Sequence, residues 1–265
     1  MWRTPEELVS IGFGRSRVVM MNEFHSGLQR CSWTREVGRR ILPVAQQAGV
    51  RYLAMEALNP LFAEKGNQTR QVPEAHNSYL AQPDMRALIQ TALDLGMTLL
   101  PYEADMNQLP SELASKGYMH QEVTNWRENE QAHNLFSALS ALRSDTKLLV
   151  WCGNGHHTKQ IVHAEVVVRE GKLVPKPEHE PDWIPMGYLF RQISGLDPFT
   201  IHQGVRTVIR KTQEGFSDVS HEALDEYKAQ LEAFGGIAGV LKEEFPDLAR
   251  RDGDAYIFSA SNTLE

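Results

Sequence analysis

The amino-acid sequence predicts an α/β protein, with a central, mainly parallel sheet, helices on both faces, long loop insertions and an added C-terminal α+β segment. Short apolar runs recur through the first 170 residues, and amphipathic stretches separate them. Runs of this length and β-branched content are typical of strands buried on both faces. Because strands that alternate with helices form right-handed crossovers, we expect their sheet to be parallel.

Four runs predict the strands of this sheet, and three amphipathic stretches predict helices between them. The strands are expected at residues 17–21, 51–55, 97–100 and 147–152. The helix before the third strand has apolar residues at helical spacing from Met85 to Leu95, with Pro83 in its first turn and Gly96 at its C-terminal cap. Further helices are expected over 37–48, bent at Pro43, and over about 120–143.

The remaining segments are loops and C-terminal additions. Residues 57–82 and 104–119 leave the carboxyl ends of predicted strands, and loops this long are usually lids or binding segments. The C-terminal third predicts a hairpin around Glu170-Gly171, strands at 205–209 and 256–258, and a helix over about 219–233. Residues 12–16 resemble a phosphate loop only superficially, and we interpret them as a turn.

Length and composition bound the architecture. With 265 residues, 42% of them hydrophobic, the chain can bury one substantial core. It has no internal repeat and no Gly/Ser linker, so we expect a single domain over 1–265, with residues 161–265 as a C-terminal extension packed on a motif-bearing core at 17–160. Two cysteines are too few for a disulfide framework.

Charge and hydropathy exclude several partners. The net charge is −7 and the basic residues are scattered, which argues against nucleic acid. No apolar run approaches the roughly 18 residues of a membrane span, and no secretory segment opens the sequence, so we expect a cytoplasmic protein with no membrane partner. The sequence leaves the oligomeric state open.

Polar residues follow each of the four predicted strands. Glu23 and His25 come after the first, Glu56 after the second, Glu103 after the third and His156 after the fourth. Any one of them alone would ordinarily be a solvated loop residue or a structural histidine. The carboxyl ends of parallel strands lie along one edge, where ligands bind. Burying several ionisable groups together is unfavourable unless function or pairing compensates, so we expect a shared site.

Arg127 is a sixth site residue. It shares a helix face with Gln131 and Asn134, at i, i+4 and i+7, on the stripe that faces inward. Arg127 could pair with one of the carboxylates or bind an anionic group of a substrate. A surface arginine on a slightly shifted helix is the alternative.

These residue types suit the activation of water. The sequence has no Gly-x-Ser-x-Gly motif, so no serine nucleophile is expected. Glu23 could orient His25 as a general base, and His156 could protonate the leaving group or stabilise the oxyanion. A second possibility is a divalent metal ion, zinc, manganese or iron, held by Glu23, His25, Glu56 and His156. The sequence does not separate these two cases.

Other residues are expected to be structural. Cys152 lies at the end of an apolar strand, where a cysteine is usually a small packing residue. Trp126, Trp151 and Trp183 are expected in the core, without a role as a stacking platform.

Several short motifs resemble those of the erythromycin esterase / ChaN-like / Tiki-TraB superfamily. They are Asn22-Glu23-Phe24-His25, Glu56 after a strand that follows Gly49, Arg127-Glu128-Asn129-Glu130-Gln131-Ala132, and Val150 to His156. The resemblance covers about residues 17–160 and implies an α/β fold with a polar cluster at the carboxyl edge of the sheet. It assigns Glu23 and His25 to the first catalytic motif, Glu56 to the second acid, Arg127 to the helix arginine and His156 to the final histidine. Glu103 rests on its strand position.

The resemblance implies three kinds of activity. Esterase-like members hydrolyse a macrolide lactone, Tiki-like members look like metal-dependent proteases, and ChaN-like members bind haem or iron. The Glu23-x-His25 spacing is that of the ChaN-like branch, and Asn22 stands where the family usually has glycine, so a macrolide substrate is not expected.

The leading hypothesis is a hydrolase that cleaves an ester, lactone or amide bond of a small molecule or peptide, with or without a metal. The alternative is a haem-, iron- or other metal-binding protein without catalysis. Asn22 suggests a third hypothesis, an interaction protein whose ancestral site has decayed.

Overall fold

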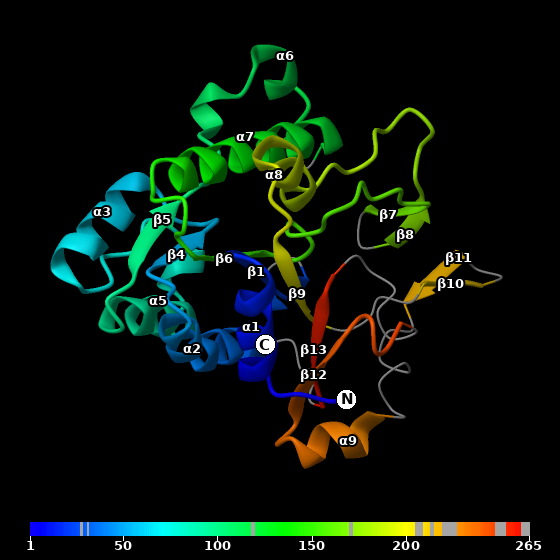
Figure 1. Ribbon diagram of the computed structural model, residues 1–265. Coiled ribbons are helices and arrows are strands. Elements are labelled where there is room, and N and C mark those ends of the chain that lie inside the picture. Colours follow the sequence, from blue (N-terminus) through cyan, green and yellow to red (C-terminus); the bar gives the residue numbers. More distant parts are fainter. Residues whose placement is uncertain are drawn as a thin grey trace.

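The computed structural model contains a seven-stranded sheet with helices on both faces (Figure 1). It describes residues 1–26, 29–30, 32–117, 120–169, 172–204, 209–212, 215–218, 227–246 and 253–260. The strand order is β12-β13-β9-β1-β6-β4-β5, and only the β12–β13 pair is antiparallel. The strands are β1 (Val18–Glu23), β4 (Tyr52–Met55), β5 (Thr98–Pro101), β6 (Leu148–Gly153), β9 (Phe199–Gln203), β12 (Ile237–Leu241) and β13 (Ala255–Ser259). The predicted α/β class is therefore confirmed.

The two central strands are buried along their whole length. β1 lies between β6 and β9, with Met21 beside Trp151 of β6 and Ile201 of β9. Every residue of β1 and β6 is buried, as their continuous apolar runs predicted. Beyond the β1–β9 ladder, the Asn22 amide exchanges two hydrogen bonds with the backbone of Gln203, at 2.9 and 2.6 Å. Asn22 therefore joins two strands of the sheet.

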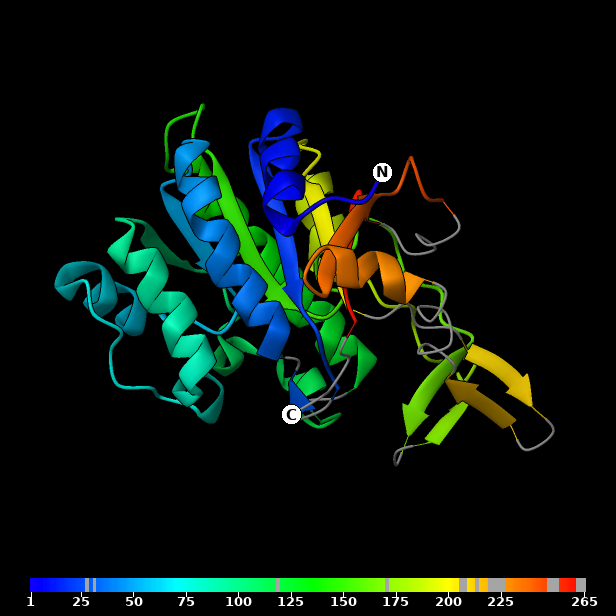
Figure 2. The ribbon, with the colours of Figure 1, turned by 90° about the horizontal axis from the view of Figure 1, so that it is seen from below.

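Helices cover both faces of the sheet. Figure 2 shows α1 (Pro5–Arg15), α2 (Ser32–Gln47) and α5 (Pro83–Asp94) together on one face. On the other face α7 (Gln121–Ser140) packs beside α8 (Met186–Ser194). The alternation of the strands divides the core accordingly. Met21 and Trp151 face the first group of helices, whereas Met20 and Cys152 face the second.

Shorter elements fill the long connections and the C-terminal part. The first long connection contains α3 (Pro60–Thr69) and α4 (Ser78–Ala81), and the second contains the 3₁₀ helix η1 (Met106–Gln108) and α6 (Ser111–Ala114). Three two-stranded ladders and one helix complete the described elements: β2 (His25–Ser26) with β3 (Gln29–Arg30), β7 (Val166–Arg169) with β8 (Lys172–Pro175), β10 (Ile209–Thr212) with β11 (Gly215–Asp218), and α9 (Lys228–Ala233).

Most predicted elements are present. The four strands match β1, β4, β5 and β6, the three helices match α2, α5 and α7, and the hairpin and last strand match β7–β8 and β13. α2 continues through Pro43. The strand expected at 205–209 and the helix expected at 219–233 fall largely outside the described residues, which contain only Ile209 of the first and α9 of the second. The elements α1, α8, β9 and β12 were not predicted.

The turn predicted at 12–16 is wrong, because residues 12–15 form the last turn of α1. A capping box between Thr4 and Glu7 begins this helix, with Pro5 in its first turn. Gly12 lets the helix approach the sheet, since a Cβ atom there would lie 2.7 Å from the Phe199 ring of β9.

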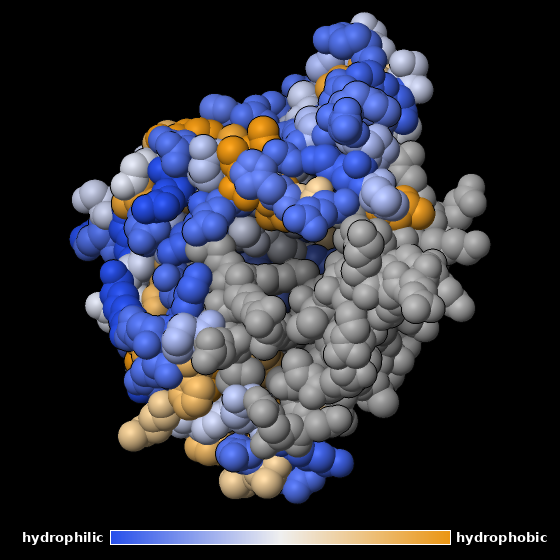
Figure 3. Space-filling view, turned by 90° about the vertical axis from the view of Figure 1, so that its right-hand side faces the viewer, coloured by the Kyte–Doolittle hydropathy of each residue, from blue (hydrophilic) through white to orange (hydrophobic). Residues whose placement is uncertain are grey.

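The described surface is mainly hydrophilic on the side shown in Figure 3. Among the described residues, the exposed large hydrophobic side chains are those of Met1, Leu61 and Phe234. None of the described helices is long and apolar enough to span a bilayer.

Close packing between α2 and the sheet predicts the effect of a methyl group at Gly38. A Cβ atom there would lie 2.8 Å from the Trp151 ring and 2.9 Å from Leu88. We expect Gly38→Ala to lower the free energy of unfolding by about 1–3 kcal/mol, because overpacking exceeds the gain in helix propensity. Exposed Gly14 of α1 has open space, so Gly14→Ala is the matched control and should stabilise by up to about 1 kcal/mol. Urea unfolding measures both; a Gly38→Ala protein as stable as the parent would contradict this packing.

Candidate functional site

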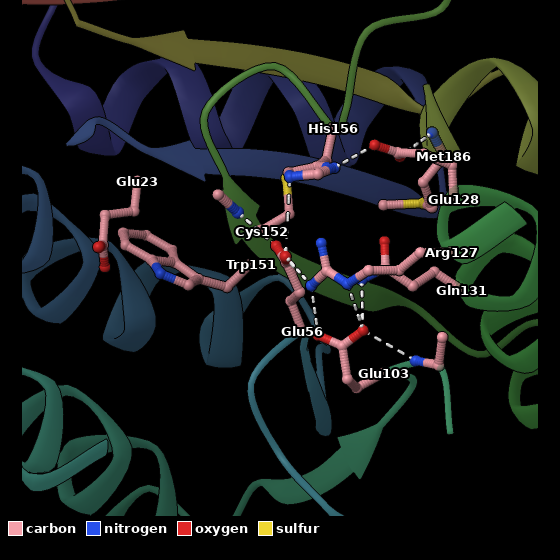
Figure 4. A network of polar contacts seen from close by, with 12 residues as sticks. Glu23, Glu56, Glu103, Arg127, Glu128, Gln131, Trp151, Cys152, His156 and Met186 are labelled. Carbon is pink, nitrogen blue, oxygen red and sulfur yellow. Dashed lines mark hydrogen bonds and ion pairs between the residues drawn. The ribbon is translucent and has the colours of Figure 1, made fainter. Parts of the chain in front are cut away.

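Arg127 of α7 joins two of the predicted site carboxylates (Figure 4). Its Nη2 atom lies 2.5 Å from Glu56 Oε1 and 2.5 Å from Glu103 Oε2, and its Nε donates to Glu103 Oε1 at 2.9 Å. Gln131, one turn further along α7, donates to the same Glu103 oxygen at 2.9 Å. The polar residues on the inward stripe of α7 therefore bind the acids that follow β4 and β5.

The carboxylate of Glu56 has three polar partners. Its Oε2 accepts the Gly153 N–H at 2.6 Å, and its Oε1 lies 3.7 Å from His156 Nε2 as well as against Arg127. Burial alone would raise the pKa of Glu56, but the positive charges of His156 and Arg127, with the Gly153 N–H, hold it well below its usual value. Glu56 is therefore ionised at neutral pH.

His156 lies between two carboxylates from different elements. Its Nδ1 lies 2.5 Å from Glu128 Oε1 of α7, and its Nε2 faces Glu56. Burial opposes the charge on the ring, but Glu128 and Glu56 raise the pKa of His156 from 6.5 to about 9. At neutral pH His156 is therefore an imidazolium, which can donate a proton or stabilise negative charge but cannot accept a proton.

Glu103 has the opposite electrostatic balance to Glu56. Burial raises the pKa of Glu103, Arg127 lowers it, and the nearby charge of Glu56 raises it again; the sum is a pKa above the usual value. The backbone N–H of Ala104 also donates to Glu103 Oε1 at 2.9 Å. Glu103 therefore takes up a proton more readily than Glu56 does.

Glu23 lies apart from this cluster. In Figure 4 it is on the other side of Trp151 from Glu56. Its carboxylate is fully buried and accepts two hydrogen bonds from Arg35 of α2, at 2.8 and 3.0 Å, and one from Tyr79 at 3.0 Å. Burial opposes the Arg35 charge, but Glu23 raises the pKa of this guanidinium. The Glu23 carboxylate is therefore bound into the fold.

His25 begins β2, directly after β1, but its side chain lies outside the described residues. The predicted pairing of Glu23 with His25 therefore stays a prediction. Of the six predicted site residues, the structure brings together Glu56, Glu103, Arg127 and His156.

A cavity of about 1290 Å³ opens beside the cluster. Glu56, Glu103, Arg127 and His156 form part of its wall. Both long connections contribute to the rest, with Leu58, Asn59, Pro60, His76, Asn77 and Tyr79 from the first and Ala104, Asp105, Met106 and Gln108 from the second. Glu23 is absent from this lining, although Tyr79 connects it to the cavity. Both long connections therefore line the cavity, and their role as lids or binding segments stays a prediction.

The described donors do not fit a divalent metal ion. Among the described residues, no three His, Cys, Asp or Glu side chains are arranged to hold one. The Glu56 and Glu103 oxygens are paired with Arg127, and both His156 nitrogens face carboxylates. A metal ion would have to displace or oppose these cations. We therefore assign no metal to these four residues.

Sequence reasoning missed three residues of the site. Glu128 directly follows Arg127, and its oxygens accept hydrogen bonds from Trp183 and from the Met186 N–H as well as facing His156. Trp183 was expected in the core; it lies half-buried against His156 instead, whereas Trp151 and Cys152 are buried as expected. Tyr79 comes from α4, in the first long connection. Of these three residues, only Glu128 could have been found from the sequence, because it is a charged residue next to Arg127 in a helix whose inward face was predicted to be partly polar.

Comparison with known proteins places the fold in a class. No protein-family model and no curated protein matches the sequence. The chain has an erythromycin esterase/ChaN-like fold, as the motifs predicted. The solved structure that supports this fold is that of a mutant of erythromycin esterase EreC in its open conformation. It matches 100% of this chain and 98% of its own, with a TM-score of 0.57 and 12% identity.

Two other solved structures are less similar. ChaN of Campylobacter jejuni, described with cofacial haem binding, matches 96% of this chain and 91% of its own, with a TM-score of 0.48 and 10% identity. RRSP, a MARTX toxin effector domain from Vibrio vulnificus, matches 81% of this chain with a TM-score of 0.42 and 15% identity. The chain spans only 37% of the length of RRSP and 38% of that of another bacterial toxin.

The buried Glu23–Arg35 pair predicts a large loss of stability on removal of one partner. Arg35→Met would leave a buried carboxylate without its cation, and we expect the free energy of unfolding to fall by about 3–5 kcal/mol. Arg39→Met is the control on the same helix, because Arg39 forms an exposed pair with Glu36 worth at most about 1 kcal/mol. Denaturant unfolding measures both, and equal effects would contradict a fully buried pair.

Proposed function

We propose that the protein is a hydrolase that uses water to cleave an ester, lactone or amide bond of a small molecule or peptide. One observation carries this proposal: the His156 ring lies between Glu56 and Glu128, which raise its pKa, at the wall of a large cavity. A cationic donor at the wall of a binding cavity is suited to stabilise the oxyanion of a tetrahedral intermediate. The full-length similarity to EreC, whose name describes an esterase, supports the same class.

The cavity is large enough for the proposed substrates. Ligand pockets commonly measure about 300–1,000 Å³, and this cavity of about 1290 Å³ exceeds that range. Apolar side chains such as Leu58 and Met106 line it together with the charged cluster. A bulky molecule could therefore bind with its reactive carbonyl beside His156.

In the proposed reaction, His25 takes a proton from water while the water oxygen attacks the carbonyl carbon. The assignment of His25 as the base rests on the sequence. The carbonyl oxygen becomes an oxyanion that faces the Nε2–H of His156. When the tetrahedral intermediate collapses, the carbon–oxygen or carbon–nitrogen bond breaks and the leaving atom takes the proton of His156. Solvent then removes the proton from His25 and returns one to His156.

Arg127 and the acids set the charge around this step. Arg127 keeps Glu56 ionised and in place, and Glu56 in turn favours the protonated form of His156. Glu103, which follows the neighbouring strand β5, accepts two further hydrogen bonds from Arg127. We assign these three residues to electrostatic orientation of His156 and of the substrate.

Substitution of the two histidines tests the proposal. We expect His156→Ala and His25→Ala each to lower kcat/KM by about 10²–10⁴-fold on any ester, lactone or amide that the parent hydrolyses, because a proton donor or acceptor is lost. His133→Ala is the matched control, since His133 is exposed on α7 and does not line the cavity. A substrate panel, with circular dichroism to verify folding, measures the effects. Unimpaired turnover in both variants would overturn the proposal.

The pH dependence provides a second test. The charge on His156 is present below its raised pKa and is lost as the pH rises through about 9. We therefore expect kcat/KM of the parent to fall on the alkaline side of pH 9. A profile that stays flat to pH 10.5 would contradict a protonated His156. A Soret band or stoichiometric metal in purified protein without turnover would favour the binding-protein alternative instead.

A further inference from the structure

We propose that Glu128 and Trp183 are positioning residues, which hold the His156 ring so that its Nε2–H faces the cavity. This inference rests on the proposed hydrolase, because it explains how the proposed proton donor is oriented. Neither residue lines the cavity, so both act through His156.

Glu128 is the acceptor that orients the ring. Its carboxylate is buried and receives hydrogen bonds from His156 Nδ1 at 2.5 Å, Trp183 Nε1 at 2.7 Å and the Met186 N–H at 2.6 Å. Both Glu128 oxygens accept hydrogen bonds from other donors, so Glu128 is also the acceptor toward His156 and the proton of this bond lies on Nδ1. The other nitrogen, Nε2, is then directed toward Glu56 and the cavity.

Trp183 limits the rotation of both partners. Its ring meets the His156 ring edge-on, with centroids 5.6 Å apart and planes at 87°. Its Nε1–H fixes the same Glu128 oxygen that binds His156. A Cβ atom at Gly155 would lie 3.0 Å from the Trp183 ring. The indole therefore fills the space between the His156 loop and Glu128.

The segment that carries Trp183 is itself anchored to the site. Asn125 of α7 donates to the Asp182 carbonyl at 2.8 Å and accepts the Ile184 N–H at 3.0 Å. The Trp183 carbonyl accepts the Val162 N–H at 2.9 Å, and the Gly187 N–H donates to the His156 carbonyl at 2.7 Å. Residues after 160, outside the motif-bearing part of the chain, thus fix the orientation of His156.

The charged groups that face His156 allow the two roles to be separated. Glu56 from the end of β4 and Glu128 from α7 favour the imidazolium, whereas Arg127 opposes it. Glu128→Gln removes one of the two favourable charges but keeps an oxygen that can accept from Trp183. Trp183→Phe keeps an aromatic six-membered ring but removes the pyrrole ring with its N–H.

The test measures the ring of His156 directly and turnover separately. NMR titration of labelled histidine gives the tautomer and pKa of His156 in the parent, Glu128→Gln, Trp183→Phe and the control Glu122→Gln, an exposed acid of α7 paired with Lys116. We expect the pKa to fall by at least one unit in Glu128→Gln, about a tenfold loss of proton affinity. We expect Trp183→Phe to leave this pKa within half a unit but to lower kcat about tenfold at unchanged KM. Glu122→Gln should change neither.

Each outcome is decisive. If Glu128→Gln folds and leaves the tautomer and pKa of His156 unchanged, the inference is overturned, and if it does not fold, an unchanged kcat in Trp183→Phe overturns it. A lower pKa in Glu128→Gln, with no hydrolysis by the parent across the substrate panel, would confirm the positioning of His156 and contradict the proposed function. A loss of unfolding stability alone, without these changes, would indicate a purely structural role and overturn the inference.

Discussion

The Arg127 guanidinium allows several carboxylates to share one partly buried edge of the sheet. Glu56 and Glu103 both bind it. A second cation, the imidazolium of His156, lies between Glu56 and Glu128. Three acids therefore surround two cations. Burial, together with the nearby charge of Glu56, raises the pKa of Glu103, while Glu56 stays ionised. Without Arg127, two half-buried acids would face each other, which is unfavourable.

The strand order of the sheet brings these charged groups close together. β6 pairs with β4, and β4 pairs with β5, so Glu56, Glu103 and His156 all follow adjacent parallel strands at their carboxyl ends. α7 covers the same edge and supplies Arg127 and Glu128 as consecutive residues that reach different partners. The C-terminal part of the chain then adds β9, β12 and β13 to the sheet and Trp183 to the site. The cluster therefore depends on contacts between residues far apart in the sequence.

The strand ends and Arg127 were predictable because periodicity and parallel pairing determine where they meet. Glu23 was predicted to join them, but no sequence pattern indicated that Arg35, on the helix that follows, pairs with its carboxylate. Trp183 contacts Glu128 across 55 positions of the chain, and no local pattern encodes such a contact. α1 was missed because its glycines suggested a turn, although Gly12 serves close packing against Phe199. Asn22 suggested a decayed site, yet its amide has a structural partner in Gln203.

A phosphonate ester, which carries the negative charge and tetrahedral shape of the intermediate, tests the central claim most directly. Its binding is measured by calorimetry at pH 7 and pH 10.5, with a bulky analogue of the best substrate. If the His156 imidazolium is the oxyanion donor, the phosphonate binds at pH 7 at least tenfold more tightly than at pH 10.5, and His156→Ala abolishes that difference. Equal affinity at both pH values, or a pH dependence that survives His156→Ala, would contradict the account.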